Sequence, residues 1–195
     1  MDNEQIRTFI AIELPQDFKD NLREFQSKLK ARQQNFIKWV DPGLMHLTLK
    51  FLGAQSPKQI ETIKSALGIS ASSCSPFYIG AGQPGFFPGL RNVRIYWIGL
   101  SGDLDRLVSL QKNVEDLLAD KGFQRETRAF AAHLTLARLK DECSMQNRSS
   151  FVKSVQGVSF PTGYSFVVDR ISLMKSTLTP KGPHYSTLAE YKFAV

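Results

Sequence analysis

The sequence is poor in cysteine: Cys74 and Cys143 are the only two among 195 residues, and they form no CxxC arrangement. A disulfide framework or a zinc–thiolate site is therefore disfavoured, and we expect two free thiols in a reducing compartment. Long apolar runs are also missing, because Glu13 and Pro15 interrupt the apolar stretch near the N-terminus. We expect neither a signal peptide nor a transmembrane helix, and hence a cytoplasmic protein that binds no membrane.

No block of like charge occurs along the chain, although 25 basic and 18 acidic residues give a net charge of +7. This balance favours a polyanionic partner such as nucleic acid, whereas the dispersal of the basic groups disfavours a disordered nucleic-acid-binding tail. With 42% hydrophobic residues, the chain has enough apolar material for one compact unit or two closely fused lobes. We expect a monomer.

Histidine is scarce as well, and two of the three histidines belong to one tetrapeptide, His-Leu-Thr-Leu, which occurs at residues 46–49 and 133–136. Successive side chains of a strand point to opposite faces, so each histidine shares a face with its threonine while the leucines face the core. A single copy is well explained as an ordinary amphipathic strand. A structural role alone does not explain why the same polar residues recur at the same offsets. The pair therefore predicts two histidines that face one cleft as an acid–base site.

The two halves of the sequence follow the same order of expected elements. In the first half we expect a strand at 7–13, a helix from Pro15, the His46 strand, a short helix from Ser56 that ends before Gly68, and strands at 77–81 and 93–100 joined by a loop at 83–89. In the second half we expect a helix from Asp103 to Gly122, the His133 strand, a helix near 147–155, and strands at 164–175 and 185–193. Such a repeat indicates an internal duplication. We predict a single bilobal α+β domain over residues 1–195, with halves of roughly 1–100 and 101–195.

Paired histidines suit a reaction that removes one proton and supplies another at neutral pH. In-line displacement at phosphorus is such a reaction, because the attacking hydroxyl is deprotonated on one side and the leaving oxygen is protonated on the other. Thr48 and Thr135, two residues beyond the histidines, would donate hydrogen bonds to phosphate oxygens. Two neutral donors do not neutralise a phosphodiester, so a nearby Arg or Lys is expected.

The two HxTL motifs, in the segments RTFIAIELP, HLTLKFLG and HLTLAR, resemble those of the 2H phosphoesterase superfamily, and most closely the RNA 2′,3′-cyclic phosphodiesterases, also called 2′-5′ RNA ligases. The resemblance implies two pseudo-symmetric lobes, each an antiparallel sheet with helices outside, and His strands that line a central cleft. It implies hydrolysis of RNA ends bearing a 2′,3′-cyclic phosphate to a 2′-phosphomonoester without metal or nucleotide cofactor. Some members also join RNA ends reversibly through 2′-5′ linkages.

By the same resemblance, His46 is the proton donor to the departing 3′ oxygen, His133 is the proton acceptor that activates water, and Thr48 and Thr135 hold the phosphoryl oxygens. Arg138 occupies the place of a phosphate-binding arginine, and Tyr185 in a Gly-Pro-x-Tyr pattern is a candidate to line the cleft.

Two positions depart from simple expectation. Strict alternation puts Arg138 on the face opposite His133, so it reaches the cleft only if the strand ends or bulges there; otherwise it is a solvated charge at a strand end. Ala132 stands where many relatives have proline, which bears on how well His133 is held rather than on whether it acts.

Other candidates are weaker. Phe86 and Phe87 would stack on a terminal base or plug the edge of the core, and His184 is expected at the surface. A zinc site on His46 and His133 is disfavoured because neither motif carries a further ligand at metal-binding spacing. Two other functions remain open: a 2H phosphodiesterase acting on 2′-5′ oligonucleotides or another small cyclic nucleotide, and a non-catalytic RNA-binding module.

Overall fold

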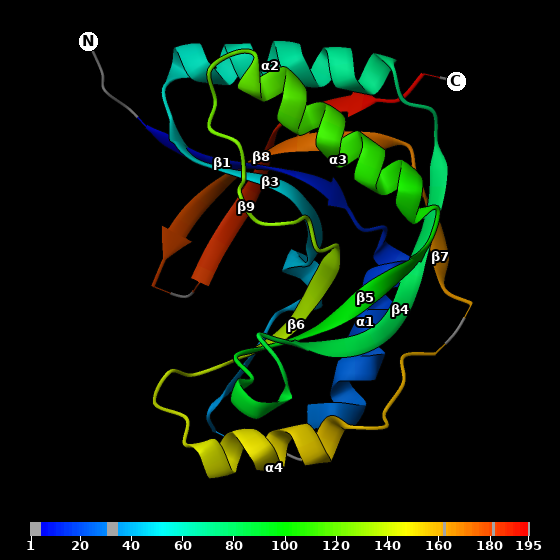
Figure 1. Ribbon diagram of the computed structural model, residues 1–195, viewed down its shortest axis with the longest axis vertical. Helices are drawn as coiled ribbons and strands as arrows, with labels where there is room; N and C mark the ends of the chain where they lie inside the picture. The colour runs from blue at the N-terminus through cyan, green and yellow to red at the C-terminus, as the bar shows by residue number, and fades with distance from the viewer. Residues whose placement is uncertain (1–4, 31–34, 162, 181, 195) are drawn as a thin grey trace.

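The computed structural model describes residues 5–30, 35–161, 163–180 and 182–194, which form an α+β fold of two antiparallel sheets (Figure 1). Sheet A has the strand order β3-β1-β8-β9 and sheet B the order β2-β6-β5-β4-β7. The predicted fold class, two lobes that are each an antiparallel sheet with outer helices, is confirmed. Among the described residues, no helix is long and apolar enough to span a membrane.

Sheet A forms the upper lobe in Figure 1, where helices α2 and α3 cover its outer face. Its strands are β1 (Ile6–Glu13), β3 (His46–Gln55), β8 (Arg170–Thr179) and β9 (Gly182–Lys192). Helix α2 (Pro57–Ser72) begins at the predicted Ser56 cap, whose hydroxyl accepts from the Gln59 amide in a capping box. Helix α3 spans Leu104–Ala119.

Sheet B forms the lower lobe, and helices α1 and α4 pack against it. Its strands are β2 (Ile37–Trp39), β4 (Phe77–Phe87), β5 (Ile95–Gly102), β6 (His133–Leu139) and β7 (Ser165–Val168). Helix α1 (Gln16–Lys30) buries Phe18 and Leu22 at the spacing expected of an amphipathic helix. Helix α4 spans Met145–Val155, close to the predicted helix.

The two lobes are built by a chain that crosses between them. Strand β1 of sheet A leads into α1, which lies against sheet B, and the chain then returns through β2 to β3 beside β1. Strand β5 of sheet B leads into α3, which lies over sheet A, and the chain then returns to β6 beside β5. Each sheet therefore contains strands from before and after residue 100, and the division into duplicated halves stays a prediction about origin.

Three element predictions were wrong in detail. The Gly/Pro-rich segment 83–89 is not simply a loop, because β4 continues through a register irregularity near Pro84 as far as Phe87. The strand expected at 164–175 is two strands, since the chain leaves sheet B after β7 and enters sheet A at β8. Helix α2 does not end before Gly68, because helical backbone tolerates a glycine that packs beneath the Tyr191 ring.

Candidate active site

Both His strands carry the same backbone irregularity three residues after the histidine. In the pairing of β1 with β3, Leu49 has no partner, and in the pairing of β5 with β6, Leu136 has none. Each is the extra residue of a β-bulge, which reverses the alternation of side chains beyond it. The repeated bulge shows that the two motifs share local structure as well as sequence.

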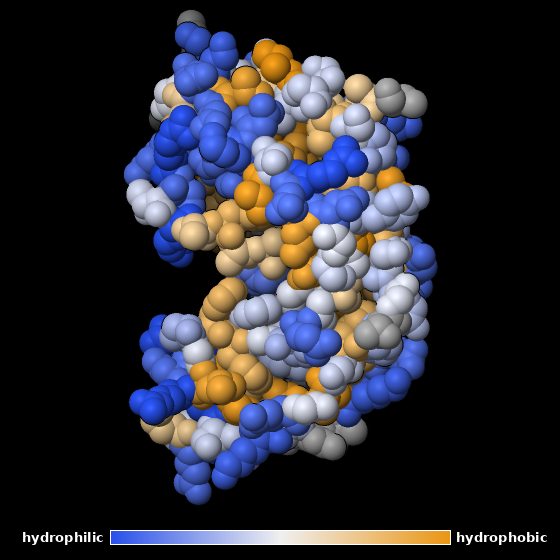
Figure 2. Space-filling view, turned by 45° about the vertical axis from the view of Figure 1, so that its right-hand side comes forward, coloured by the Kyte–Doolittle hydropathy of each residue, from blue (hydrophilic) through white to orange (hydrophobic). Residues whose placement is uncertain are grey.

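Upstream of the bulge, the predicted faces are confirmed. Leu47, Leu49, Leu134 and Leu136 are at most 3% exposed in the core. The two histidines and two threonines of the motifs are only partly buried and lie on the other face. These faces turn toward each other because the helices lie outside, and β3 and β6 approach each other between the sheets. Figure 2 shows the hollow between the lobes, with apolar and neutral residues on its walls and hydrophilic residues around its margin.

The two imidazoles are held in the same way. Nδ1 of His46 lies 2.9 Å from the Leu44 carbonyl oxygen, and Nδ1 of His133 lies 2.7 Å from the Ala131 carbonyl oxygen. A carbonyl oxygen only accepts, so Nδ1 must carry the proton in each ring. In the neutral state, Nε2 is then free to accept a proton, and in the charged state it donates one.

The surroundings of His46 are the more enclosed. Phe9 of β1 stacks on its ring at a centroid distance of 4.6 Å, and Tyr185 of β9 meets it edge-on at 5.1 Å. Burial lowers the pKa of His46, while the Leu44 carbonyl opposes this shift; Lys19 lowers the pKa further, and Glu13 raises it. Tyr185, predicted from the sequence, therefore lies at this histidine.

The surroundings of His133 are aromatic too, but the contacts are edge-on. Its ring centroid lies 5.0 Å from that of Phe87 and 6.2 Å from that of Trp97. Phe87 thus lies at the site, whereas Phe86 packs against Tyr96 at the core. Trp97 was missed, although alternation along β5 from buried Tyr96 was a signal for it.

Beyond the bulge, Arg138 returns to the face of His133 and Thr135, because Leu136 and Ala137 are consecutively buried. It is exposed and lies across from Lys38 of β2. The corresponding residue after the first motif is Phe51, which is 71% exposed. Sequence reasoning missed Phe51 for the reason that made Arg138 doubtful: strict alternation assigns both to the wrong face.

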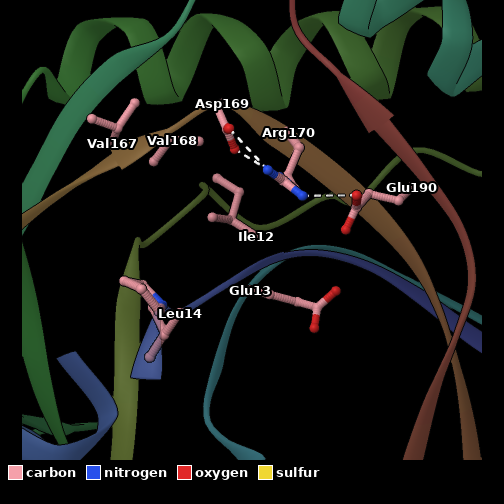
Figure 3. Close-up of a pocket in the computed structure, with 9 residues that line it drawn as sticks. Ile12, Glu13, Leu14, Val167, Val168, Asp169, Arg170 and Glu190 are labelled. Carbon is pink, nitrogen blue, oxygen red and sulfur yellow. Dashed lines mark hydrogen bonds and ion pairs between the residues drawn. The ribbon is translucent and has the colours of Figure 1, made fainter. Parts of the chain in front are cut away.

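A pocket whose lining includes acidic and basic side chains lies next to the His46 wall of the cleft. This cavity of about 270 Å³ is lined in part by Glu13, the cross-strand partner of His46, and by a fork in which Arg170 donates to Asp169 and Glu190 (Figure 3). Glu13 also accepts a 2.8 Å hydrogen bond from the Ser172 hydroxyl. The described residues contain no cluster of three or more His, Cys, Asp or Glu side chains arranged to hold a metal ion. His184 is exposed, as predicted.

Sequence comparison agrees with this geometry. The family model described as LigT like Phosphoesterase matches residues 12–97 and again residues 98–185. The RNA 2′,3′-cyclic phosphodiesterase of Methanocaldococcus jannaschii is 32% identical over 186 residues, covering 95% of this chain and 100% of the relative. The protein of that name from Thermotoga maritima is 32% identical over 188 residues, covering 96% of each chain.

Solved structures share the fold. LigT of E. coli, in a complex with 3′-AMP, superposes with a TM-score of 0.80 at 21% identity, covering 98% of this chain and 100% of that one. TT0787 of Thermus thermophilus gives a TM-score of 0.79 at 24% identity, covering 96% of this chain and 98% of that one. At these identities the likeness establishes the arrangement of the two lobes.

Proposed function

The chain belongs to the LigT-like phosphoesterases of the 2H superfamily, and from that premise we propose that it hydrolyses the terminal 2′,3′-cyclic phosphate of RNA to a 2′-phosphomonoester. The names of the relatives support this substrate. The observation that carries the proposal is the matched pair of imidazoles, which turn Nε2 away from a carbonyl-bound Nδ1 on two strands that face one hollow.

The proposed reaction is an in-line displacement. Nε2 of His133 removes a proton from water as the water oxygen forms a bond to phosphorus. The bond between phosphorus and the 3′ oxygen breaks on the opposite side, and Nε2 of His46 supplies the proton to that oxygen. The phosphate stays on the 2′ oxygen, and one histidine has gained the proton that the other has lost.

Charge that develops on the phosphoryl oxygens needs donors fixed in advance. Thr48 and Thr135 share the faces of the two histidines, and we assign their hydroxyls to these oxygens. Arg138 adds a full positive charge on the same face as His133, where the bulge returns it. An ionised donor makes hydrogen bonds roughly twice as strong as neutral ones, so Arg138 is the stronger contact.

The lowered pKa of His46 is compatible with its role as acid. In the free protein, burial favours the neutral ring. A bound phosphodiester brings a negative charge next to the imidazole, which favours the charged form and raises the pKa in the complex. Substrate binding thus helps to load the proton that His46 later donates.

The decisive experiment incubates purified protein, in the presence of EDTA, with an oligoribonucleotide that ends in a 2′,3′-cyclic phosphate. We expect a 2′-phosphate end, identified by its separation from the 3′ isomer. A 3′-phosphate product would reverse the assignment of the leaving oxygen. An intact cyclic end, with cleavage of 2′-5′ oligonucleotides instead, would assign a different phosphodiester to the same site.

A further inference from the structure

A buried ion pair lies close to the first motif but outside the site described above. Lys50 and Glu115 have side chains only 5% and 9% exposed, and the Lys50 Nζ lies 2.7 Å from Glu115 Oε2. Burying two charges costs desolvation energy that their attraction does not reliably offset, and well-packed apolar residues often stabilise a fold as well. Stability alone therefore gives little reason for this pair, and its location indicates another role.

Lys50 joins three parts of the chain. Lys50 directly follows the bulge at Leu49, and the bulge turns the Lys50 side chain to the helix-covered side of β3. Its ammonium group donates to both carboxylate oxygens of Glu115 on α3, at 2.8 and 2.7 Å, and to the Gln124 carbonyl oxygen at 2.9 Å. All three N–H groups are thereby used. We call Lys50, Glu115 and Gln124 the Lys50 clamp.

The Lys50 clamp holds the chain that delivers the other histidine. Residues 124–132 lead to His133, which is the first residue of β6. Glu115 also accepts a hydrogen bond from the backbone amide of Glu126 in this segment, at 3.4 Å. The strand of the first motif in sheet A thus fixes the start of the segment that ends at the histidine of the second motif in sheet B.

A second buried polar side chain makes the mirror connection. Gln26, on the other crossing helix α1, is fully buried and donates through Nε2 to the Val40 carbonyl at 2.8 Å and the Leu136 carbonyl at 3.0 Å. Leu136 is the bulge residue of the second motif, and Val40 begins the segment 40–45 that leads to His46. We call Gln26, Val40 and Leu136 the Gln26 clamp.

We propose that Lys50, Glu115 and Gln26 are positioning residues that set the separation of the two imidazoles, a role that rests on the function proposed above. Each clamp ties the bulged strand of one motif to the segment that delivers the histidine of the other. Both histidines are the first residues of their strands, so a loosened segment displaces them more than the threonines two residues further on. Losing a clamp should therefore slow proton transfer more than it weakens phosphate binding.

The test replaces the ion pair with apolar residues in the double variant Lys50→Met/Glu115→Met, which leaves no unpaired buried charge. We expect kcat to fall about 10- to 100-fold, as small misplacements of catalytic groups do, with KM within about twofold of the original. A matched control is Lys64→Met/Glu61→Met, which removes an exposed 2.8 Å ion pair on α2. The control should keep its full kcat.

Because the chain has few histidines, NMR of their imidazole rings provides a measurement that does not depend on turnover. With three histidines in the chain, the imidazole Cε1 proton resonances are resolvable by NMR, and exposed His184 serves as an internal reference. The double variant should shift the His133 resonance and leave that of His184 in place. If the double variant does not fold, Gln26→Met tests the mirror clamp, and its His46 and His133 resonances should both shift.

The outcomes separate this inference from the proposed function. Unchanged kcat and an unmoved His133 resonance in the folded double variant would overturn the positioning role, as would a rise in KM at constant kcat or an equal loss in the control. If the original protein left the cyclic phosphate intact, the proposed function would fail, while the NMR measurement would still decide whether the clamps hold the imidazoles.

Discussion

The His46 wall and the His133 wall of the cleft share a backbone but differ in their side chains. Both strands begin at the histidine, whose Nδ1 atom is hydrogen-bonded to the carbonyl oxygen two residues earlier in the chain. Both strands also have a bulge three residues after the histidine. His46, however, is stacked on Phe9, whereas His133 meets aromatic rings only edge-on. The shared backbone provides what both walls need, a presented Nε2. We expect the differing neighbours to distinguish the two rings as acid and base in the proposed reaction.

The largest expected effect comes from removing either imidazole. His46→Ala and His133→Ala should each lower kcat by about 10²- to 10⁴-fold, because each removes one partner of a concerted proton transfer. The variant that combines His46→Ala with His133→Ala should have a kcat little below that of either single variant, since the losses caused by removing groups that act as a unit are not additive. Single-turnover hydrolysis of a cyclic-phosphate end measures this. If either folded variant kept the kcat of the unmodified protein, the histidine that it lacks would not take part in the proton transfer.

The next effect contrasts Phe51 and Arg138, which lie two residues after the two bulges. Arg138→Ala removes the charge-assisted hydrogen bond that we propose for the phosphate, and such a bond is worth about 1.5–3 kcal/mol. The variant should therefore lower kcat/KM by a similar factor for every terminal base. Phe51→Ala removes no charge and should cost less, with a loss that varies with the base as stacking does.

Values of kcat/KM on substrates with different terminal bases test this contrast. A near-original kcat/KM for Arg138→Ala, or a loss confined to one base, would make Arg138 an ordinary surface charge at a strand end.

The pH dependence sharpens the difference between the two histidines. Both kcat and kcat/KM should be bell-shaped, with His46 active when protonated and His133 active when neutral. The optimum of kcat/KM lies midway between the two pKa values of the free protein that bound the profile, so the lowered pKa of His46 should place this optimum at lower pH than an ordinary histidine at that position would. The optimum of kcat should lie at higher pH, because bound phosphate raises the pKa of His46 in the complex.

The profile is measured across pH with and without EDTA, and the chelator should leave it unchanged. A rate that rises steadily with pH, or that needs added divalent metal, would indicate a metal-bound hydroxide instead of the paired histidines.

The smallest effect tests the enclosure of His46 directly. Tyr185→Ala removes an edge contact and lets water reach the ring, so the pKa of His46 should rise. The NMR titration of the His46 Cε1 proton measures this change, and Phe87→Ala, the matched change beside His133, should leave that titration in place. A His46 titration that moves with Phe87→Ala but not with Tyr185→Ala would show that Tyr185 does not enclose this ring.

The sequence was sufficient to predict the parts of the site that follow from local alternation. The faces of His46, Thr48, His133 and Thr135 could be predicted because they lie upstream of the bulges. The positions beyond them could not, since a bulge depends on how a strand pairs with its neighbour rather than on its own residues. For this reason Phe51 was missed and Arg138 was left open.

The same limit applies to the fold. Element order revealed the repeat of strand, helix and His strand, because helical and strand periodicities are local. The crossing of α1 and α3 to the opposite lobe is decided by tertiary packing, which no local pattern records. The break between β7 and β8 was missed for the same reason, since it is a change of sheet within an extended segment.

The crossing of the chain between sheets has a consequence for unfolding. A lobe made from one contiguous stretch can melt by itself, but here each sheet loses strands and a covering helix if either half of the chain comes away. We therefore expect a single cooperative heat-denaturation transition, with equal calorimetric and van't Hoff enthalpies. Polypeptides ending and restarting near Gly102 should each remain unfolded alone and recover ordered structure only when mixed.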